Sequence, residues 1–220
     1  MLSYKPGARA GDACFQEKRD VVFPTNDARA GKWIDSFWGQ APNLDEEIMR
    51  RSTLLFFAGS VRKPPGRGPD KIGAYSLNAR QTVFRYHHDR PGFDLVEGHV
   101  NDYGDRMRKA RFCLVTCGFG WANRITAAMA NGCLPLIVMP GVTNPFERDH
   151  LLDYKEFSLR VELEDVPRLP EIISAISEEK LRLMRLSLEK AYPTLMWEPL
   201  GTAFNTTITA LANKWDWVNT

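Results

Sequence analysis

The chain has 220 residues, enough for one large domain or a domain with a docked appendage. Its hydrophobic fraction of 44% and its charged fraction of 25% are ordinary for a soluble globular protein. The formal net charge of +2 gives no electrostatic reason to expect a nucleic-acid partner. No apolar run approaches the ~20 residues needed to cross a bilayer, and residues 1–13 lack the apolar stretch of a signal peptide. As written, the chain is expected to be soluble.

The cysteines are too few for a disulfide scaffold, and no CxxC pair is present. We expect buried thiols or a single bridge rather than a metal site. The four residues are Cys14, Cys113, Cys117 and Cys133.

Six segments have the character of β-strands. Three are continuous apolar runs, typical of strands buried on both faces of a sheet: residues 53–59, 112–116 and 134–139. Three weaker candidates, the last with the alternation of an edge strand, are residues 82–86, 93–96 and 157–161.

Helical patterns alternate with these strands. Residues 102–109 predict a short helix capped by Asp102, and residues 121–131 predict a helix that ends at Gly132. Helical spacing dominates from Pro167 onward and ends in an amphipathic segment at 200–215. The alternation indicates an α/β fold: a Rossmann-like open, mostly parallel sheet with helices on both faces.

Ligands of open α/β sheets bind beyond the carboxyl ends of the strands. The most informative such segment runs from Cys117 to Trp121, where Gly118 and Gly120 let the backbone approach a ligand without Cβ clashes. The following helix offers free N–H groups and a positive dipole end, which suits a phosphate. Arg124 in its first turn is unfavourable for the helix alone, and a nearby anion would explain it. A plain tight turn and a solvated arginine are the alternatives.

Two further segments carry candidate ligands. Arg62, three residues after Gly59, is placed to clamp a diphosphate; the alternative is a solvated basic loop. Glu147 either accepts hydrogen bonds from a sugar or opens a helix as an N-terminal carboxylate. His87 and His88 are expected to form an exposed strand end. Successive side chains of a strand point to opposite faces, so the two histidines are not expected to share a metal ion.

Several segments, in this order, resemble the exostosin-type glycosyltransferases. They are CF at 14–15, DVVFP at 20–24, LLFFAGSVR at 54–62, YGDRMRKARFCL at 103–114, GFGWANR at 118–124, NGCLPLIV at 131–138, NPFE at 144–147 and FSLRVE at 157–162. The similarity runs from about residue 14 to residue 197.

The resemblance implies a GT-B architecture, two Rossmann-like domains around a cleft, of which this chain matches the C-terminal, donor-binding portion. It implies an exostosin-like domain at 14–197 and a C-terminal helix packed on it at 198–220, with the N-terminal acceptor domain and the membrane anchor absent. The activity implied is that of an inverting glycosyltransferase, which moves a sugar from a UDP-sugar to a glycan or glycoprotein acceptor in the Golgi. A metal ion is not expected to be required.

Matching positions imply donor-binding roles for nine residues. Arg62 would clamp the diphosphate, and the phosphate and nucleotide loop would comprise Gly118, Phe119, Gly120, Trp121 and Arg124. The residues near the donor sugar or ribose would be Pro145, Phe146 and Glu147. The mechanism implied is direct displacement, in which a base deprotonates the acceptor while arginines and helix N–H groups stabilise the departing diphosphate. The base usually comes from the acceptor side, so none is assigned.

Two positions depart from the resemblance. Ala127 stands where many relatives carry an acidic residue suited to a ribose diol, and Met139-Pro140 stands where many carry an aspartate. These losses keep a second hypothesis open: a degenerate nucleotide-binding partner of an active glycosyltransferase, whether that is a separate subunit or a missing N-terminal domain. A dehydrogenase is a poor match because GFGWAN at 118–123 lacks the third glycine of the dinucleotide fingerprint.

Overall fold

A computed structural model describes residues 20–40, 42–43, 46–47, 50–62, 75–118, 123–197 and 199–218. Within them, five parallel strands form one sheet in the order β2-β1-β3-β4-β5. The strands are β1 (Thr53–Gly59), β2 (Phe93–Glu97), β3 (Ala110–Val115), β4 (Leu134–Ile137) and β5 (Leu159–Arg160). The three apolar runs form the buried centre of the sheet, and β5 lies at its edge, as predicted.

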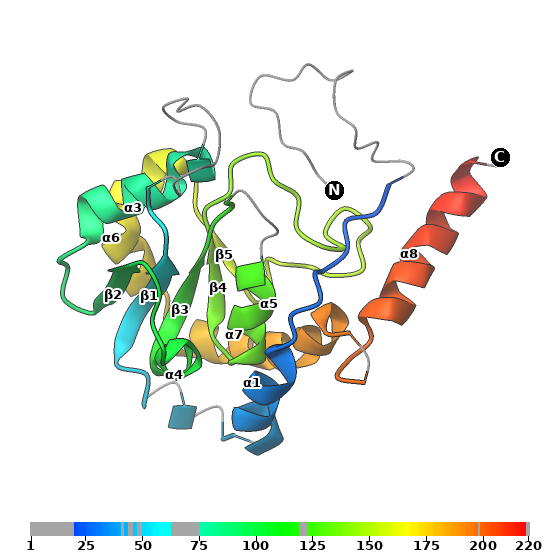
Figure 1. Ribbon diagram of the computed structural model, residues 1–220, viewed down its shortest axis with the longest axis horizontal. Helices are drawn as coiled ribbons and strands as arrows, with labels where there is room; N and C mark the ends of the chain where they lie inside the picture. Colours follow the sequence, from blue (N-terminus) through cyan, green and yellow to red (C-terminus); the bar gives the residue numbers. More distant parts are fainter. Residues whose placement is uncertain are drawn as a thin grey trace.

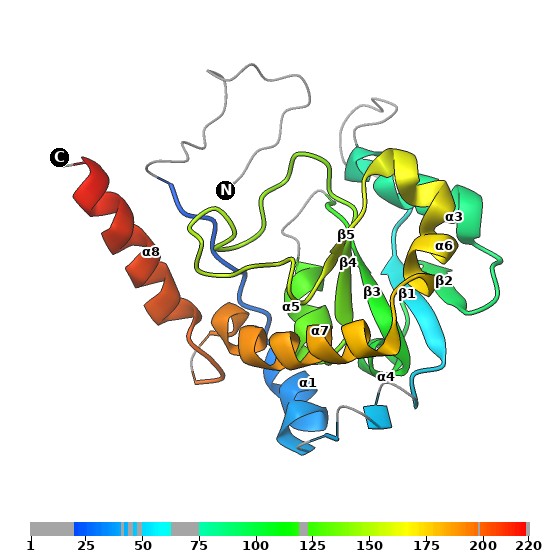
Figure 2. The same ribbon diagram turned by 180° about the vertical axis from the view of Figure 1, so that it is seen from behind.

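Helices cover both faces of the sheet, which confirms the predicted Rossmann-like α/β class (Figure 1). One face carries α1 (Ala30–Ser36), α4 (Tyr103–Lys109) and α5 (Asn123–Ala130). The opposite face carries α6 (Leu169–Ser174) and α7 (Glu178–Ala191), which cross the front of the sheet in Figure 2. The helix α3 (Ala79–His87) lies beside α6 in both views.

The last helix, α8 (Ala203–Val218), extends away from the sheet beside the segment that precedes α1 (Figure 1). Lys214 Nζ lies 2.8 Å from the Asp149 carboxylate and ties α8 to the loop between β4 and β5. No helix among the described residues is both long and apolar enough to span a bilayer.

One disulfide joins Cys113 of β3 to Cys133, immediately before β4. It fits the expectation of a single bridge. Cys117 is a half-buried free thiol, and Cys14 lies outside the described residues. No group of three or more His, Cys, Asp or Glu side chains within the described part of the chain is arranged to hold a metal ion.

The amino ends of the strands are held together by one buried guanidinium. Arg51 Nη1 donates to the carbonyls of Met107 (3.0 Å) and Ala110 (2.7 Å), and its Nη2 donates to the carbonyl of Asn131 (3.3 Å). Its side chain is 1% exposed. Because these carbonyls belong to the segments that enter β3 and β4, Arg51 fixes the starts of three neighbouring strands.

The strand predicted at residues 82–86 is wrong, because this segment is the second half of α3. Its β-branched and aromatic residues favour a strand locally. Ala79, Val83 and His87, however, recur every fourth residue and are buried together, which is the pattern of a helix face.

The predicted end of α5 at Gly132 is confirmed, whereas Asp102 precedes α4 without capping it. Gly132 has a φ of 61° just after α5, as expected of a left-handed helix terminus. Asp102 precedes α4, but its carboxylate accepts from Arg106 Nε at 2.9 Å and makes no capping hydrogen bond.

Replacing Arg51 with alanine is expected to lower the free energy of unfolding by about 3 kcal/mol or more, since it removes three hydrogen bonds to buried residues and leaves a cavity. Urea denaturation followed by circular dichroism measures the change. Arg50→Ala is the matched control, because the neighbouring Arg50 side chain is 70% exposed, and its loss should change the free energy by less than about 0.5 kcal/mol. An equal loss of unfolding free energy in the two variants would contradict the role of Arg51 in fixing the strand starts.

Candidate functional site

The chain reverses direction within the sheet between β1 and β3. It leaves β1 toward β2 on one side, returns to β3 on the other, and continues to β4 and β5. Ligands of doubly wound sheets bind at such a switch point, outside the carboxyl ends of the strands. The segments that follow β1 and β3, residues 60–62 and 116–118, therefore frame the candidate site.

Arg124 reaches this switch point from the start of α5. Its Nη2 donates to the carbonyl of Ala58 in β1 at 3.0 Å, and its guanidinium carbon lies 4.7 Å from the ring centroid of Phe57. A Cβ on Gly59 would lie 2.1 Å from the same Nη2, so only glycine leaves room for this contact. Burial raises the pKa of Tyr103, and the charge of Arg124 opposes that shift.

Arg80 is a site residue that the sequence analysis missed. It projects from α3 and is 4% exposed. Its Nε donates to Thr116 Oγ1 at 2.9 Å, and its Nη1 donates to the Ser60 carbonyl at 2.7 Å and to the Tyr75 hydroxyl. Burial, and next the charge of Arg124, lower its pKa to about 10. Arg80 therefore stays charged at neutral pH and links the ends of β1 and β3.

Cys117 and Gly118 continue the chain from β3 along the side of Arg80. Burial raises the pKa of the Cys117 thiol, and the charge of Arg80 opposes the shift. A Cβ on Gly118 would lie 2.9 Å from Arg80 Nη2, so the backbone approaches the guanidinium closely here. The predicted loop residues Phe119, Gly120 and Trp121 lie outside the described part of the chain.

Arg62 follows β1 at the same edge of the sheet. Its side chain is exposed. Within the described ranges, no hydrogen bond or ion pair holds its guanidinium. Its position agrees with the edge predicted from the sequence, and its role as a diphosphate clamp stays a prediction.

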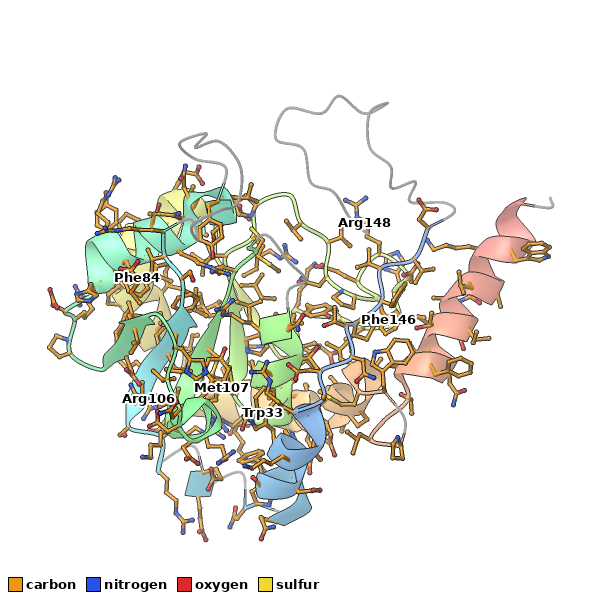
Figure 3. The ribbon with its side chains drawn as sticks, in the orientation of Figure 1. Trp33, Phe84, Arg106, Met107, Phe146 and Arg148 are labelled. Carbon is orange, nitrogen blue, oxygen red and sulfur yellow. A yellow bond between two sulfur atoms is a disulfide. The ribbon has the colours of Figure 1, made fainter. Side chains whose placement is uncertain are left out.

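The loop between β4 and β5 carries Pro145, Phe146 and Glu147. In the structure each of them forms hydrogen bonds with other residues of the chain. Phe146 is fully buried with a φ of 59°, and its N–H donates to the Val22 carbonyl at 2.9 Å. The Pro145 carbonyl accepts from the Tyr154 hydroxyl at 3.0 Å. Figure 3 shows Phe146 on the side of the molecule nearest α8.

The Glu147 carboxylate is occupied by protein donors. Its Oε2 accepts from the backbone N–H (2.8 Å) and side-chain amide (2.9 Å) of Asn144, and its Oε1 accepts from Arg160 Nη2 at 2.7 Å. The idea that Glu147 opens a helix is wrong, because residues 145–150 form turns. The carboxylate closes its own loop, and a role toward sugar or ribose stays a prediction.

The two adjacent histidines end α3 rather than a strand. His87 is 2% exposed, and its Nε2 lies 2.7 Å from the Val166 carbonyl. His88 is exposed, and its Nδ1 lies 2.8 Å from the Asp89 carboxylate. The expected exposed strand end is thus wrong for His87, which packs under residues 163–168.

A family model described as the exostosin GT47 domain matches residues 38–176, more than half of the chain. A probable glucuronosyltransferase of Oryza sativa subsp. japonica is 32% identical over 170 residues, covering 74% of this chain and 39% of that protein. The probable beta-1,4-xylosyltransferase IRX10L of Arabidopsis thaliana is 31% identical over 178 residues, covering 78% and 42%. The chain therefore spans about two fifths of the length of these relatives.

Glu147→Ala is expected to lower the free energy of unfolding by about 1–2 kcal/mol, because it leaves the Asn144 donors without their acceptor. Arg160→Ala should cost less than about 1 kcal/mol, since the ion pair that it breaks is about one-third exposed. Urea denaturation of both variants measures the difference. An equal cost would mean that the ion pair, rather than the bonds to Asn144, holds the loop.

Proposed function

The chain belongs to the exostosin GT47 domain family, and we propose that it forms the donor-binding part of an inverting glycosyltransferase. In this proposal the donor is a UDP-sugar, the acceptor is a hydroxyl group of a glycan, and the compartment is the Golgi. The relatives described above are named as a probable glucuronosyltransferase and a probable xylosyltransferase. UDP-linked uronic acids and pentoses are therefore the first donors to test.

The observation that carries the proposal is the position of Arg124. Among the described residues it forms no ion pair with a carboxylate, although it lies half-buried at the start of α5. A cation at a helix N-terminus is unfavourable by roughly 0.3–1 kcal/mol, and partial burial adds a desolvation cost. A diphosphate would offset both, because it accepts hydrogen bonds from a guanidinium and from the free N–H groups of the helix.

The proposed reaction is a direct displacement. The acceptor oxygen bonds to the anomeric carbon while the bond from that carbon to the diphosphate oxygen breaks. The electrons of that bond leave with the diphosphate, and the acceptor proton passes to a base. Arg124 and the α5 N–H groups stabilise the charge that grows on the departing diphosphate. We expect the base to come from the part of such an enzyme that holds the acceptor.

We further propose that the diphosphate is held without a divalent metal ion. Two guanidiniums, those of Arg80 and Arg124, already supply positive charge at this edge of the sheet.

Arg124→Ala is expected to weaken UDP binding about tenfold or more, since a charge-assisted contact of this kind contributes roughly 1.5–3 kcal/mol. Isothermal titration calorimetry of the purified chain with UDP measures the dissociation constant, and addition of EDTA should leave it unchanged. GDP should bind more weakly than UDP.

Arg50→Ala, an exposed arginine at the opposite end of the sheet, is the control and should bind UDP like the wild type. Wild-type affinity in Arg124→Ala would remove Arg124 from the site. If the wild-type chain binds neither nucleotide, the degenerate partner becomes the better explanation of this domain.

Bound UDP is expected to protect Cys117 from alkylation, because this thiol lies beside Arg80 at the end of β3. In a Cys14→Ser background, iodoacetamide labelling of Cys117 is followed by mass spectrometry. UDP at ten times its dissociation constant should slow labelling roughly tenfold. Unchanged labelling would place the nucleotide elsewhere. Because burial raises the pKa of Cys117, the labelling rate without UDP should keep rising above the usual pKa of a thiol.

A further inference from the structure

Arg80 differs from the other buried arginines in its electrostatic surroundings. Burial is the largest cause that lowers the pKa of Arg51, Arg185 and Arg80 alike. The carboxylate of Glu47 opposes that effect for Arg51 and Arg185. Among the described residues no carboxylate acts on Arg80, and its strongest charged neighbour is the cation Arg124. A buried cation with a like charge beside it is costly without an anion.

The guanidinium of Arg80 is held rigidly on one side and left free on the other. Its Nε and Nη1 donate to Thr116, Ser60 and Tyr75. Its Nη2 has no hydrogen-bond partner among the described residues and faces the Cα of Gly118, where a side chain would collide with it. The free donors thus lie on the side where the chain leaves β3, at the switch point of the sheet.

The two guanidiniums gather around one aromatic ring. Their central carbons lie 5.4 Å (Arg80) and 4.7 Å (Arg124) from the ring centroid of Phe57. The ring face attracts both cations but neutralises neither. Two guanidiniums beside one ring, without a carboxylate partner among the described residues, match a ligand with two linked anionic groups, each able to accept bidentate hydrogen bonds.

A strained turn sets the position of Arg80. Ser76, Leu77 and Asn78 have φ values of 56°, 50° and 63°, a left-handed conformation that costs roughly 1–2 kcal/mol for each such residue. The turn leads from Tyr75, whose hydroxyl holds Arg80, directly into α3. Strain of this kind persists where the surrounding structure fixes it, as at ligand sites.

We propose that Arg80 contacts the diphosphate of the donor through Nη2 and forms, with Arg124, a two-guanidinium clamp on the leaving group. The inference rests on the proposed function. Arg80 is the fixed member of the clamp, because protein acceptors hold two of its nitrogens. Gly118 is required to be small so that phosphate oxygens can reach Nη2.

The test uses two probes, UDP and inorganic pyrophosphate, titrated calorimetrically into the purified chain. Arg80→Gln, measured at a temperature where circular dichroism shows it folded, should weaken binding of both probes about 30-fold or more. Arg80→Lys should recover part of the loss, because it restores the charge but not the fork of donors. Arg185→Gln is the matched control for removing a buried arginine. It should lower the melting temperature while leaving both affinities within about twofold of wild type.

Should Arg80→Gln fail to fold, Gly118→Ala keeps Arg80 and its anchors but places a methyl group before Nη2. Its expected effect is a loss of about tenfold or more in affinity for both probes. Wild-type affinity for pyrophosphate in folded Arg80→Gln, or in Gly118→Ala, would overturn the clamp while leaving the proposed function in place. If the wild-type chain binds pyrophosphate but does not bind UDP, that result would support the clamp and count against the UDP-sugar donor. Binding of neither probe by the wild type would overturn both.

Discussion

The parallel pairing of β1 with β3 is the constraint on which the rest of the structure depends. The chain leaves these two strands in opposite directions, so their carboxyl ends form the switch point at which ligands of such sheets bind. Three arginines fasten the pair. Arg51, two residues before β1, binds the start of β3, while Arg80 joins Ser60 to Thr116 at the other end. Arg124, which belongs to the helix after β3, donates back to β1. The fold and the candidate site are therefore held by the same strand pair.

Arginines lie at both ends of the β1–β3 strand pair, but their charged surroundings differ between the two ends. At the amino end, backbone carbonyls accept from Arg51 and Arg185, and the nearby carboxylate of Glu47 favours their charge. At the carboxyl end, Arg80 and Arg124 also donate to carbonyls, but no carboxylate in the described part of the chain balances them. Among the described residues, two cations thus lie together at the switch point, although the whole chain carries a formal net charge of only +2. In the proposed function, the local placement of charge, rather than the total charge, would direct an anion to this site.

The sheet was predictable from the sequence because strands buried on both faces appear as continuous apolar runs, as in β1, β3 and β4. The helix α3 was not, because the local preference of residues 82–86 opposes the helical face that Ala79 and Val83 bury. Arg80 was missed for the same reason. The sequence search covered the segments that follow strands, whereas Arg80 reaches the carboxyl ends of the strands from a helix. The helical spacing of Ala79, Val83 and His87 was the available signal. The choice of Cys113 and Cys133 for the bridge needed the pairing of β3 with β4.

The alanine at position 127 bears on the charge around Arg124. Ala127 follows Arg124 by three residues on α5, a spacing at which a carboxylate and a guanidinium form an ion pair. The acidic residue that the family resemblance places there would partly neutralise Arg124 and offer an acceptor to a ribose. Ala127 is instead buried, and its carbonyl accepts from Asn131. Position 127 therefore supplies no carboxylate to pair with Arg124 or to accept a hydrogen bond from a ribose. If the chain binds a nucleotide-sugar, other residues must supply the contacts to its ribose.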